Sequence, residues 1–262
     1  MRVKYNFVNR KLIPTDSEKP ILTIFINPDE SEKKYLLETL ILDEHTLSSS
    51  MDPDELSRLE FEPEHVAIIL KRPKSYSASD QFNFKIGSMG AYMFKEHLIV
   101  VTADESVVFN EMSFSKTLTP AALLLKLIYR SIVHFREHLK AINAIGNEIQ
   151  LEVNTSMSNK HLLHLFELEK SMVYYLNFIN TNGFLLEKMR ANASKIGFTS
   201  EEIEVLDDII IENMQCSKQA EIYSNIFASL MDARASIISN NINVLMKTLN
   251  LITIAIMVPT FV

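Results

Sequence analysis

The spacing of apolar residues changes near the middle of the chain. In the first half, short apolar runs are separated by segments rich in Pro, Gly, Asp and Ser, a pattern typical of β-strands. Between these runs, Ser31–Leu42 and Asp52–Glu60 have helical patterns, and Pro53 fits the first turn of the second. We therefore expect an α/β domain with a mixed sheet over residues 1–115. Its predicted strands are Val3–Val8, Ile21–Asn27, His65–Lys71, Phe82–Ile86, Ala91–Lys95 and His97–Thr102.

In the second half, apolar residues recur with the period of an α-helix. The clearest row is Leu124, Ile128, Ile132, Phe135, Leu139 and Ile142. The pattern predicts helices over Pro120–Glu152 and Asn159–Arg190, the second with a break at Thr181-Asn-Gly183. Residues 116–198 are thus expected to be a helical region that packs on the last helix.

The last helix is predicted to be unusually long. Gly197 is a stop signal, Thr199-Ser-Glu-Glu202 is a start signal, and no Pro or Gly interrupts the chain from there to Pro259. At 1.5 Å per residue, such a helix spans roughly 90 Å. Residues 199–262 are expected to form a stalk, which makes the fold class α+β. Its apolar residues form a coiled-coil or bundle seam: Ile222, Ile226, Leu230, Ala233, Ile237, Val244 and Leu251.

The composition is that of a globular protein, with 47% hydrophobic and 23% charged residues. The net charge of −7 argues against a nucleic-acid partner, because phosphate binding needs a basic surface. Cys216 is the single cysteine, so an intrachain disulfide is excluded, and we expect this thiol to be buried. The N-terminus lacks the apolar core of a signal peptide, which favours a cytosolic first domain.

Two histidine pairs allow a metal site but have simpler interpretations. His134-Phe-Arg-Glu-His138 matches the inverted zinc-peptidase pattern, in which two imidazoles hold zinc and the glutamate acts as the base. The alternative is a pair of surface histidines. His161 and His164 are likewise either a metal pair or part of a solvated helix face. Gly87-Ser-Met-Gly90 is interpreted as a hairpin turn, and phosphate-loop and nucleophile-elbow motifs are absent, so we do not expect an enzyme.

Acidic residues follow the start of the last helix. Glu201 and Glu202 are interpreted as helix-start charges favoured by the helix dipole. Asp208 lies further in, beside three isoleucines. Because hard divalent cations prefer oxygen ligands, Asp208 is either a metal ligand near a subunit interface or another helix-start charge.

A polar stripe continues to the end of the chain, where Lys247 is the last ionisable side chain. It consists of Asn243, Met246, Asn250, Thr253, Met257 and Thr260, at alternating steps of three and four. In lipid, unpaired amides and hydroxyls are unfavourable, so such residues should face other helices or water. Around a shared axis they would form rings that pass a partly hydrated cation, with Lys247 reaching the cytosolic interface. A buried core helix is the alternative.

This end of the chain resembles the CorA family of divalent-cation channels, which includes magnesium transporters and zinc-transporting relatives. The similar stretch is Leu230-Met-Asp-Ala-Arg-Ala-Ser-Ile-Ile-Ser-Asn-Asn-Ile-Asn-Val-Leu-Met-Lys247, followed by Ile256-Met-Val-Pro-Thr260. The resemblance implies a homopentamer in the cell membrane, with residues 1 to about 243 on the cytoplasmic side and the last helix continuing into the bilayer as a pore helix. It implies the pore-facing residues Asn243, Met246, Leu249, Asn250, Thr253, Met257 and Thr260.

The resemblance also implies the ions and their sites. Magnesium is the favoured transported and regulatory cation, no organic cofactor is expected, and Asp208 falls on a stalk carboxylate that binds regulatory magnesium between subunits. The partner carboxylate belongs near Ser50 and Met51, which replace the expected acids, so that Asp52 is the adjacent candidate. The family's Gly-Met-Asn signature would follow Val262. A zinc-transporting relative and a membrane-tethered oligomeric scaffold or sensor remain the alternatives.

Overall fold

The computed structural model describes residues 1–9, 11–76, 83–104, 118–155 and 159–260. The N-terminal part is built on a seven-stranded sheet with the order β2-β1-β3-β7-β6-β5-β4. Strands β3 and β7 run parallel and the other neighbours run antiparallel, so the sheet is mixed, as predicted. The strands are β1 (Arg2–Val8), β2 (Lys11–Pro14), β3 (Leu22–Ile26), β4 (Arg58–Phe61), β5 (Val66–Pro73), β6 (Ile86–Met93) and β7 (Leu98–Thr102).

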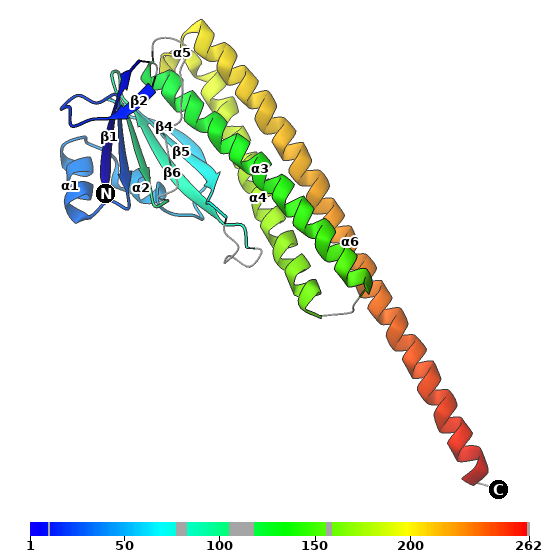
Figure 1. The fold of residues 1–262 in the computed structure, drawn as a ribbon. Coiled ribbons are helices and arrows are strands. Elements are labelled where there is room, and N and C mark those ends of the chain that lie inside the picture. Colours follow the sequence, from blue (N-terminus) through cyan, green and yellow to red (C-terminus); the bar gives the residue numbers. More distant parts are fainter. Residues whose placement is uncertain (10, 77–82, 105–117, 156–158, 261–262) are drawn as a thin grey trace.

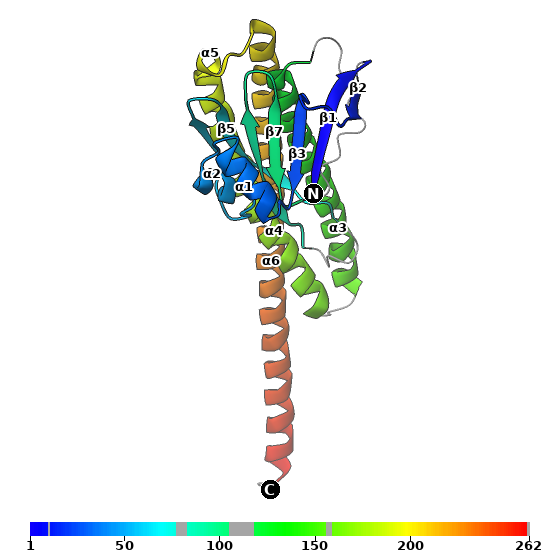
Figure 2. The ribbon, with the colours of Figure 1, turned by 90° about the vertical axis from the view of Figure 1, so that its left-hand side faces the viewer.

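Helices cover both faces of this sheet (Figures 1 and 2). The short helices α1 (Glu30–Glu38) and α2 (Glu44–Ser49) lie on one face, and a bundle of long helices lies on the other. Side chains of β7 alternate accordingly, since Leu98 and Val100 belong to the core under the bundle and Ile99 and Val101 to the core under α1 and α2. Burial on both faces explains why this strand is apolar throughout.

The bundle consists of α3 (Pro120–Thr155), α4 (Asn159–Ala191) and α6 (Ser200–Thr260), with the short α5 (Ala193–Ile196) between the last two. Glycine allows close helix packing, because a Cβ on Gly146 of α3 would lie 2.4 Å from the ring of Phe227 on α6. Within the described part of the chain, no residue after Phe227 is buried. The rest of α6 leaves the bundle and projects alone (Figure 1).

The three long helices confirm the predictions made from the helical period. Gly197 has a φ of 91° and ends α5, as a stop signal should. Thr199 and Glu202 form the predicted capping box, with Thr199 N donating to Glu202 Oε2 at 2.8 Å and Glu202 N donating to Thr199 Oγ1 at 3.3 Å. The division at residues 115 and 198 stays a prediction, because the sheet and the bundle share one core.

The predicted break at Thr181-Asn-Gly183 is wrong, since α4 is continuous there. Asn182 is 1% exposed and binds the backbone of Lys71 on β5. A Cβ on Gly183 would lie 3.1 Å from the amide nitrogen of Asn213 on α6. These residues resemble a turn in sequence, but they are used for contacts between elements.

Two further predictions of local structure are wrong. Asp52–Glu60 is a turn that leads into β4, whereas the helix is α2, which precedes it and is capped by Asp43 accepting from Thr46 N at 2.8 Å. Gly87-Ser-Met-Gly90 is not a hairpin turn but lies inside the fully buried strand β6. Its glycines make room for neighbours, because a Cβ on Gly90 would overlap the hydroxyl of Ser50. The start of the predicted strand at Phe82 lies outside the described residues.

Candidate ion pathway and metal site

The polar stripe predicted at the C-terminal end lies on the projecting part of α6. Asn243, Asn250 and Thr253 are exposed, and Met246, Leu249 and Met257 are 53%, 57% and 50% exposed. No described residue from 242 to 257 is buried, so the alternative of a buried core helix is wrong for the single subunit. The side chain of Thr260 lies outside the described residues.

The hydroxyls on this helix have their protons already engaged. Thr253 Oγ1 donates to the Leu249 carbonyl at 2.9 Å, and Thr248 Oγ1 donates to the Val244 carbonyl at the same distance. This back-bonding is the usual way in which a helical threonine satisfies its proton without another helix. The Thr253 oxygen can still accept a hydrogen bond, because a hydroxyl carries two acceptor lone pairs.

The same exposed stripe continues toward the start of α6. Going back from Asn243 in steps of three and four residues leads to Asp208 through positions that are mostly polar, with Ile222 and Ile211 as the apolar exceptions. Each position on this path is exposed. Asp232 is the acidic residue in the middle of it and was not among the predicted site residues. The sequence contains a signal for Asp232, because this residue lies at the same three- and four-residue steps as the terminal stripe. The positions are Ser239, Ser236, Asp232, Ser229, Asn225, Ile222, Lys218, Gln215, Ile211 and Asp208.

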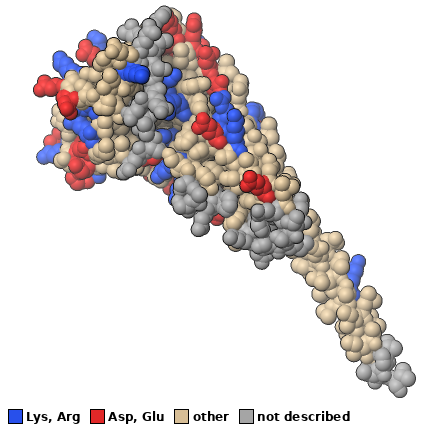
Figure 3. Space-filling model, viewed as in Figure 1, with Lys and Arg blue, Asp and Glu red and all other residues tan. Residues whose placement is uncertain are grey.

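Charge is nearly absent from the projecting helix (Figure 3). After Arg234, Lys247 is the only ionisable residue of the chain, and its side chain is exposed. Among the helices of the described residues, none contains a stretch long and apolar enough to cross a membrane.

The two predicted metal carboxylates are both exposed but are held differently. Asp208 lies in the third turn of α6, next to Asp207, which binds Arg190 with an Nε to Oδ1 distance of 2.5 Å. Asp52 accepts a hydrogen bond from Asp54 N at 2.9 Å. In the described part of one subunit, no group of three or more His, Cys, Asp or Glu side chains could hold a metal ion.

Ser50, which replaces an expected acid, points into the fold. It is fully buried, its hydroxyl lies 2.7 Å from that of Tyr92, and it donates to the Thr46 carbonyl at 3.0 Å. Because Gly90 lies directly beneath it, a carboxylate at position 50 would have neither space nor solvent. Asp52 is consequently the first acidic side chain of this segment that reaches the surface.

A buried lysine fixes the segment that carries Asp52. Lys71 is 0% exposed, and its ammonium donates to the carbonyls of Asp52 at 3.0 Å and Pro53 at 2.9 Å and to Ser88 Oγ at 2.5 Å. Burial lowers the pKa of Lys71 to about 8, an effect opposed by the charge of Asp52. Sequence patterns could not identify this role, because Lys71 occupies the end of an apolar strand.

The zinc-peptidase interpretation finds no support in the geometry. His138 is only 8% exposed, so the surface interpretation is also wrong for this residue. Its Nδ1 lies 2.7 Å from the Tyr175 hydroxyl, and its ring centroid lies 4.4 Å from that of His134. Burial lowers the pKa of His138 to about 4, so the ring is neutral at physiological pH. His164 is half-buried, and the side chain of His161 lies outside the described residues.

A mixed sheet followed by a helical bundle, with one helix extended beyond it, is the architecture that the comparisons with known proteins share. The family model described as "CorA-like Mg2+ transporter protein" matches residues 21–262. The chain belongs to this family, as the resemblance at its C-terminal end indicates. A comparison with curated protein sequences gives no match.

Solved structures share the fold at low sequence identity. The complete CorA magnesium transporter from Methanocaldococcus jannaschii aligns with a TM-score of 0.80 at 17% identity, over 97% of this chain and 82% of that one. The full-length CmaX protein aligns with a TM-score of 0.73 at 10% identity, over 96% and 81%. The ZntB cytoplasmic domain from Vibrio parahaemolyticus aligns with a TM-score of 0.66 at 12% identity, over 89% and 97%.

Proposed function

We propose that the chain is a subunit of a homopentameric divalent-cation channel, with magnesium as the favoured ion and α6 as the pore-lining helix. The observation that carries the proposal is the exposed, mostly polar stripe along α6, from Asp208 to Met257. The described residues of α3 and α4 leave this stripe uncovered, although they bury the opposite side of the helix at Ile209, Cys216 and Ala220.

Assembly around an axis would explain the exposed surfaces of α6. In one subunit, the seam residues Ile222 and Ile226 are 57% and 43% exposed, and Ile237 and Val244 are 42% and 54% exposed. Apolar side chains at three- and four-residue spacing are unfavourable in water and become buried when parallel helices pack. In the same assembly, each polar position of the stripe would be repeated once per subunit and would form a ring around the axis.

The rings would act on the cation in sequence. Asp232 would attract a hydrated cation by its charge, and the oxygens of Asn243, Asn250 and Thr253 would replace part of the hydration shell. Met246, Leu249 and Met257 would form apolar constrictions between them. Passage would be passive, driven by the concentration gradient and the membrane potential, so the protein would not be an enzyme. Thr260 would continue the row.

We place the membrane boundary near Lys247. Residues 1 to about 243 would lie on the cytoplasmic side, and the helix beyond would enter the bilayer. An exposed lysine at this level can extend its ammonium to the headgroups while its carbon chain covers apolar surface.

Regulation by magnesium would involve Asp208 of one subunit and Asp52 of its neighbour. Both are exposed, and one subunit alone offers no complete ligand group among its described residues. Lys71 would hold the Asp52 segment at a fixed height for this contact. Zinc transport is the second candidate, because the ZntB cytoplasmic domain has the same fold. An oligomeric scaffold or sensor without transport would retain the seam but would not need the stripe.

The test is magnesium flux into liposomes that contain the full-length protein, for Asn243→Leu and Thr253→Val. Flux should fall at least tenfold for Asn243→Leu and change severalfold for Thr253→Val. Thr248→Val is the matched control, because Thr248 makes the same hydrogen bond to the carbonyl four residues earlier but lies off the stripe. Normal flux in both stripe variants, or equal loss in the control, would contradict the pathway. Counting of subunits by mass measurement tests the pentamer separately.

A further inference from the structure

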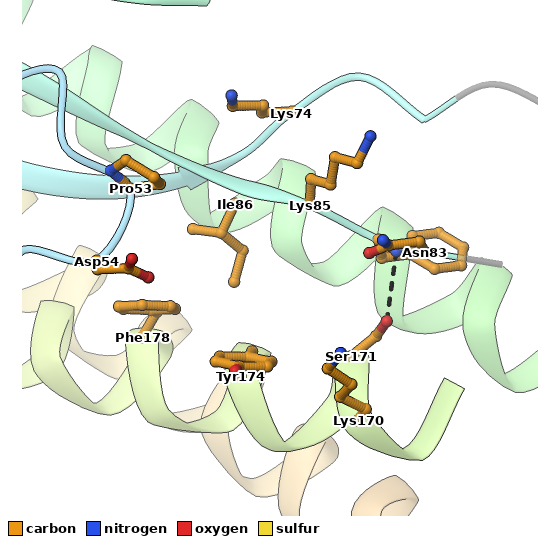
Figure 4. A pocket seen from close by; sticks show the side chains of 11 residues that line it. Pro53, Asp54, Lys74, Asn83, Lys85, Ile86, Lys170, Ser171, Tyr174 and Phe178 are labelled. Carbon is orange, nitrogen blue, oxygen red and sulfur yellow. Dashed lines mark hydrogen bonds between the residues drawn. The ribbon is translucent and has the colours of Figure 1, made fainter. Parts of the chain in front are cut away.

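A pocket lies between the sheet and α4, away from the proposed ion pathway (Figure 4). Its volume is about 260 Å³. Ile86 of β6 points toward Tyr174 and Phe178 of α4, and the loop residues Pro53 and Asp54 lie at one end. The pocket is thus formed by three separate parts of the fold.

The interior of the pocket suits a flat ring. Ile86 and Phe178 are 9% and 6% exposed and present apolar surface. Tyr174 is 49% exposed, so much of its ring is accessible for stacking. Sites for drug-sized ligands usually measure about 300–1,000 Å³, and this smaller one admits a planar ring, with the rest of a ligand at the open rim.

The rim of the pocket is positively charged, although the whole chain carries a net charge of −7. Lys74 and Lys85 come from the strand side, where Lys74 N donates to the Lys85 carbonyl at 3.0 Å, and Lys170 comes from α4. Among the described residues, neither Lys74 nor Lys170 has a carboxylate within ion-pair distance. Among the described lining residues, Asp54 is the one carboxylate, and it can accept a hydrogen bond from a ligand N–H or O–H group.

We propose that this pocket binds a small organic anion that combines a planar ring with one phosphate, of the nucleoside monophosphate type. The ring lies between Ile86 and the two aromatic side chains of α4. The phosphate stays at the open rim, where the positive charge of the lining lysines attracts it. Lysine suits a phosphate as a mobile point charge, and stacking supplies the affinity that exposed ion pairs alone do not.

The position of the pocket connects it to the segment that carries Asp52. Pro53 and Asp54 line the pocket, and the carbonyl of Pro53 accepts from the buried ammonium of Lys71 at 2.9 Å. That ammonium also lies 5.2 Å from the ring centroid of Phe178. A bound ligand therefore contacts the same loop and the same aromatic ring that hold Lys71 in place. Binding does not require ion transport, so its test is independent of the pathway.

Isothermal titration calorimetry on the whole chain tests the proposal, with AMP, adenosine and inorganic phosphate as separate titrants. AMP should bind saturably and more tightly than either fragment. The double variant Lys74→Ala/Lys170→Ala should weaken AMP binding about tenfold and leave adenosine unchanged. Tyr174→Ala should weaken AMP and adenosine alike, and higher salt should weaken only the phosphate-containing titrants.

The matched control is Lys33→Ala/Lys34→Ala on α1, which removes the same charge from an exposed surface away from the pocket. Circular dichroism confirms that each variant is folded, and the altered side chains are at least partly exposed. The proposal is overturned if AMP shows no saturable binding, if adenosine or phosphate alone binds as tightly as AMP, or if the control pair weakens AMP binding as much as the pocket pair.

Discussion

Replacing Asn182 of α4 by alanine should weaken the attachment of the helical bundle to the sheet and so lower the free energy of unfolding. Strand β4 begins at Arg58, which pairs with Ile69, so the part of the antiparallel strand β5 that follows Ile69 has no strand partner on that side. The Asn182 amide takes the place of that partner. It accepts from Lys71 N at 3.0 Å and donates to the Lys71 carbonyl at 2.8 Å, and Ser57 Oγ donates to it at 2.6 Å.

The size of the effect follows from these contacts. Without the amide, the buried Lys71 N–H loses its partner, which costs about 1–3 kcal/mol. The Lys71 carbonyl keeps a hydrogen bond from Ser131 at 3.1 Å, so its loss is smaller, about 1 kcal/mol, as is that of the Ser57 contact. We expect Asn182→Ala to lower the free energy of unfolding by about 3–5 kcal/mol, which corresponds to roughly 6–20 °C in melting temperature.

Urea and thermal unfolding, followed by circular dichroism, measure this loss. Asn180→Ala is the control on the same helix, because Asn180 is exposed and its contact, a hydrogen bond from Ser217 at 2.6 Å, lies at the surface. It should change stability by less than about 0.5 kcal/mol. If the two variants unfold at the same urea concentration, the interpretation of Asn182 as a substitute for a strand is wrong.

Three other predictions concern the bundle. The folded-state pKa of His138 is about 4, below the ordinary 6.5, so the unfolded chain takes up the proton first. The free energy of unfolding should therefore fall as pH drops from about 6.5 toward 4, by at most about 3 kcal/mol. Urea midpoints measured against pH should show this slope, and His138→Gln should reduce it. Gly146→Val should destabilise by about 1–3 kcal/mol through overlap with Phe227, measured by the same unfolding curves, whereas an unchanged midpoint would show that the helices separate freely. Burial raises the pKa of Cys216 to about 12, so a thiol reagent should label it only after urea unfolds the chain, and rapid labelling of the native protein would contradict the packing.

Much of the helical half could be predicted from sequence, because its signals are local. The period of Leu124, Ile128 and Ile132 places α3, and these side chains are buried as that period requires. Gly197 and Thr199 define the turn before α6 by backbone conformation and side-chain capping. The exposed stripe on α6 is visible in the sequence for the same reason, since one helix keeps its own spacing without help from other parts of the chain.

The tertiary structure decided what residues with the same local signals do. Thr181-Asn-Gly183 and Gly87-Ser-Met-Gly90 both have the sequence of a turn, yet both lie inside regular elements. In each segment, a side chain from a distant part of the chain occupies the space beside a glycine. In the first segment, the backbone of β5 also needs the amide of Asn182. Ser50 and Lys71 are similar cases, with an inward hydroxyl and a buried ammonium that depend on contacts 17 to 42 residues away. Hydrophobic period and capping act over a few residues and are therefore encoded locally. Burial, hydrogen-bond satisfaction and the pocket beside α4 depend on which distant segments meet, and only the folded chain sets that.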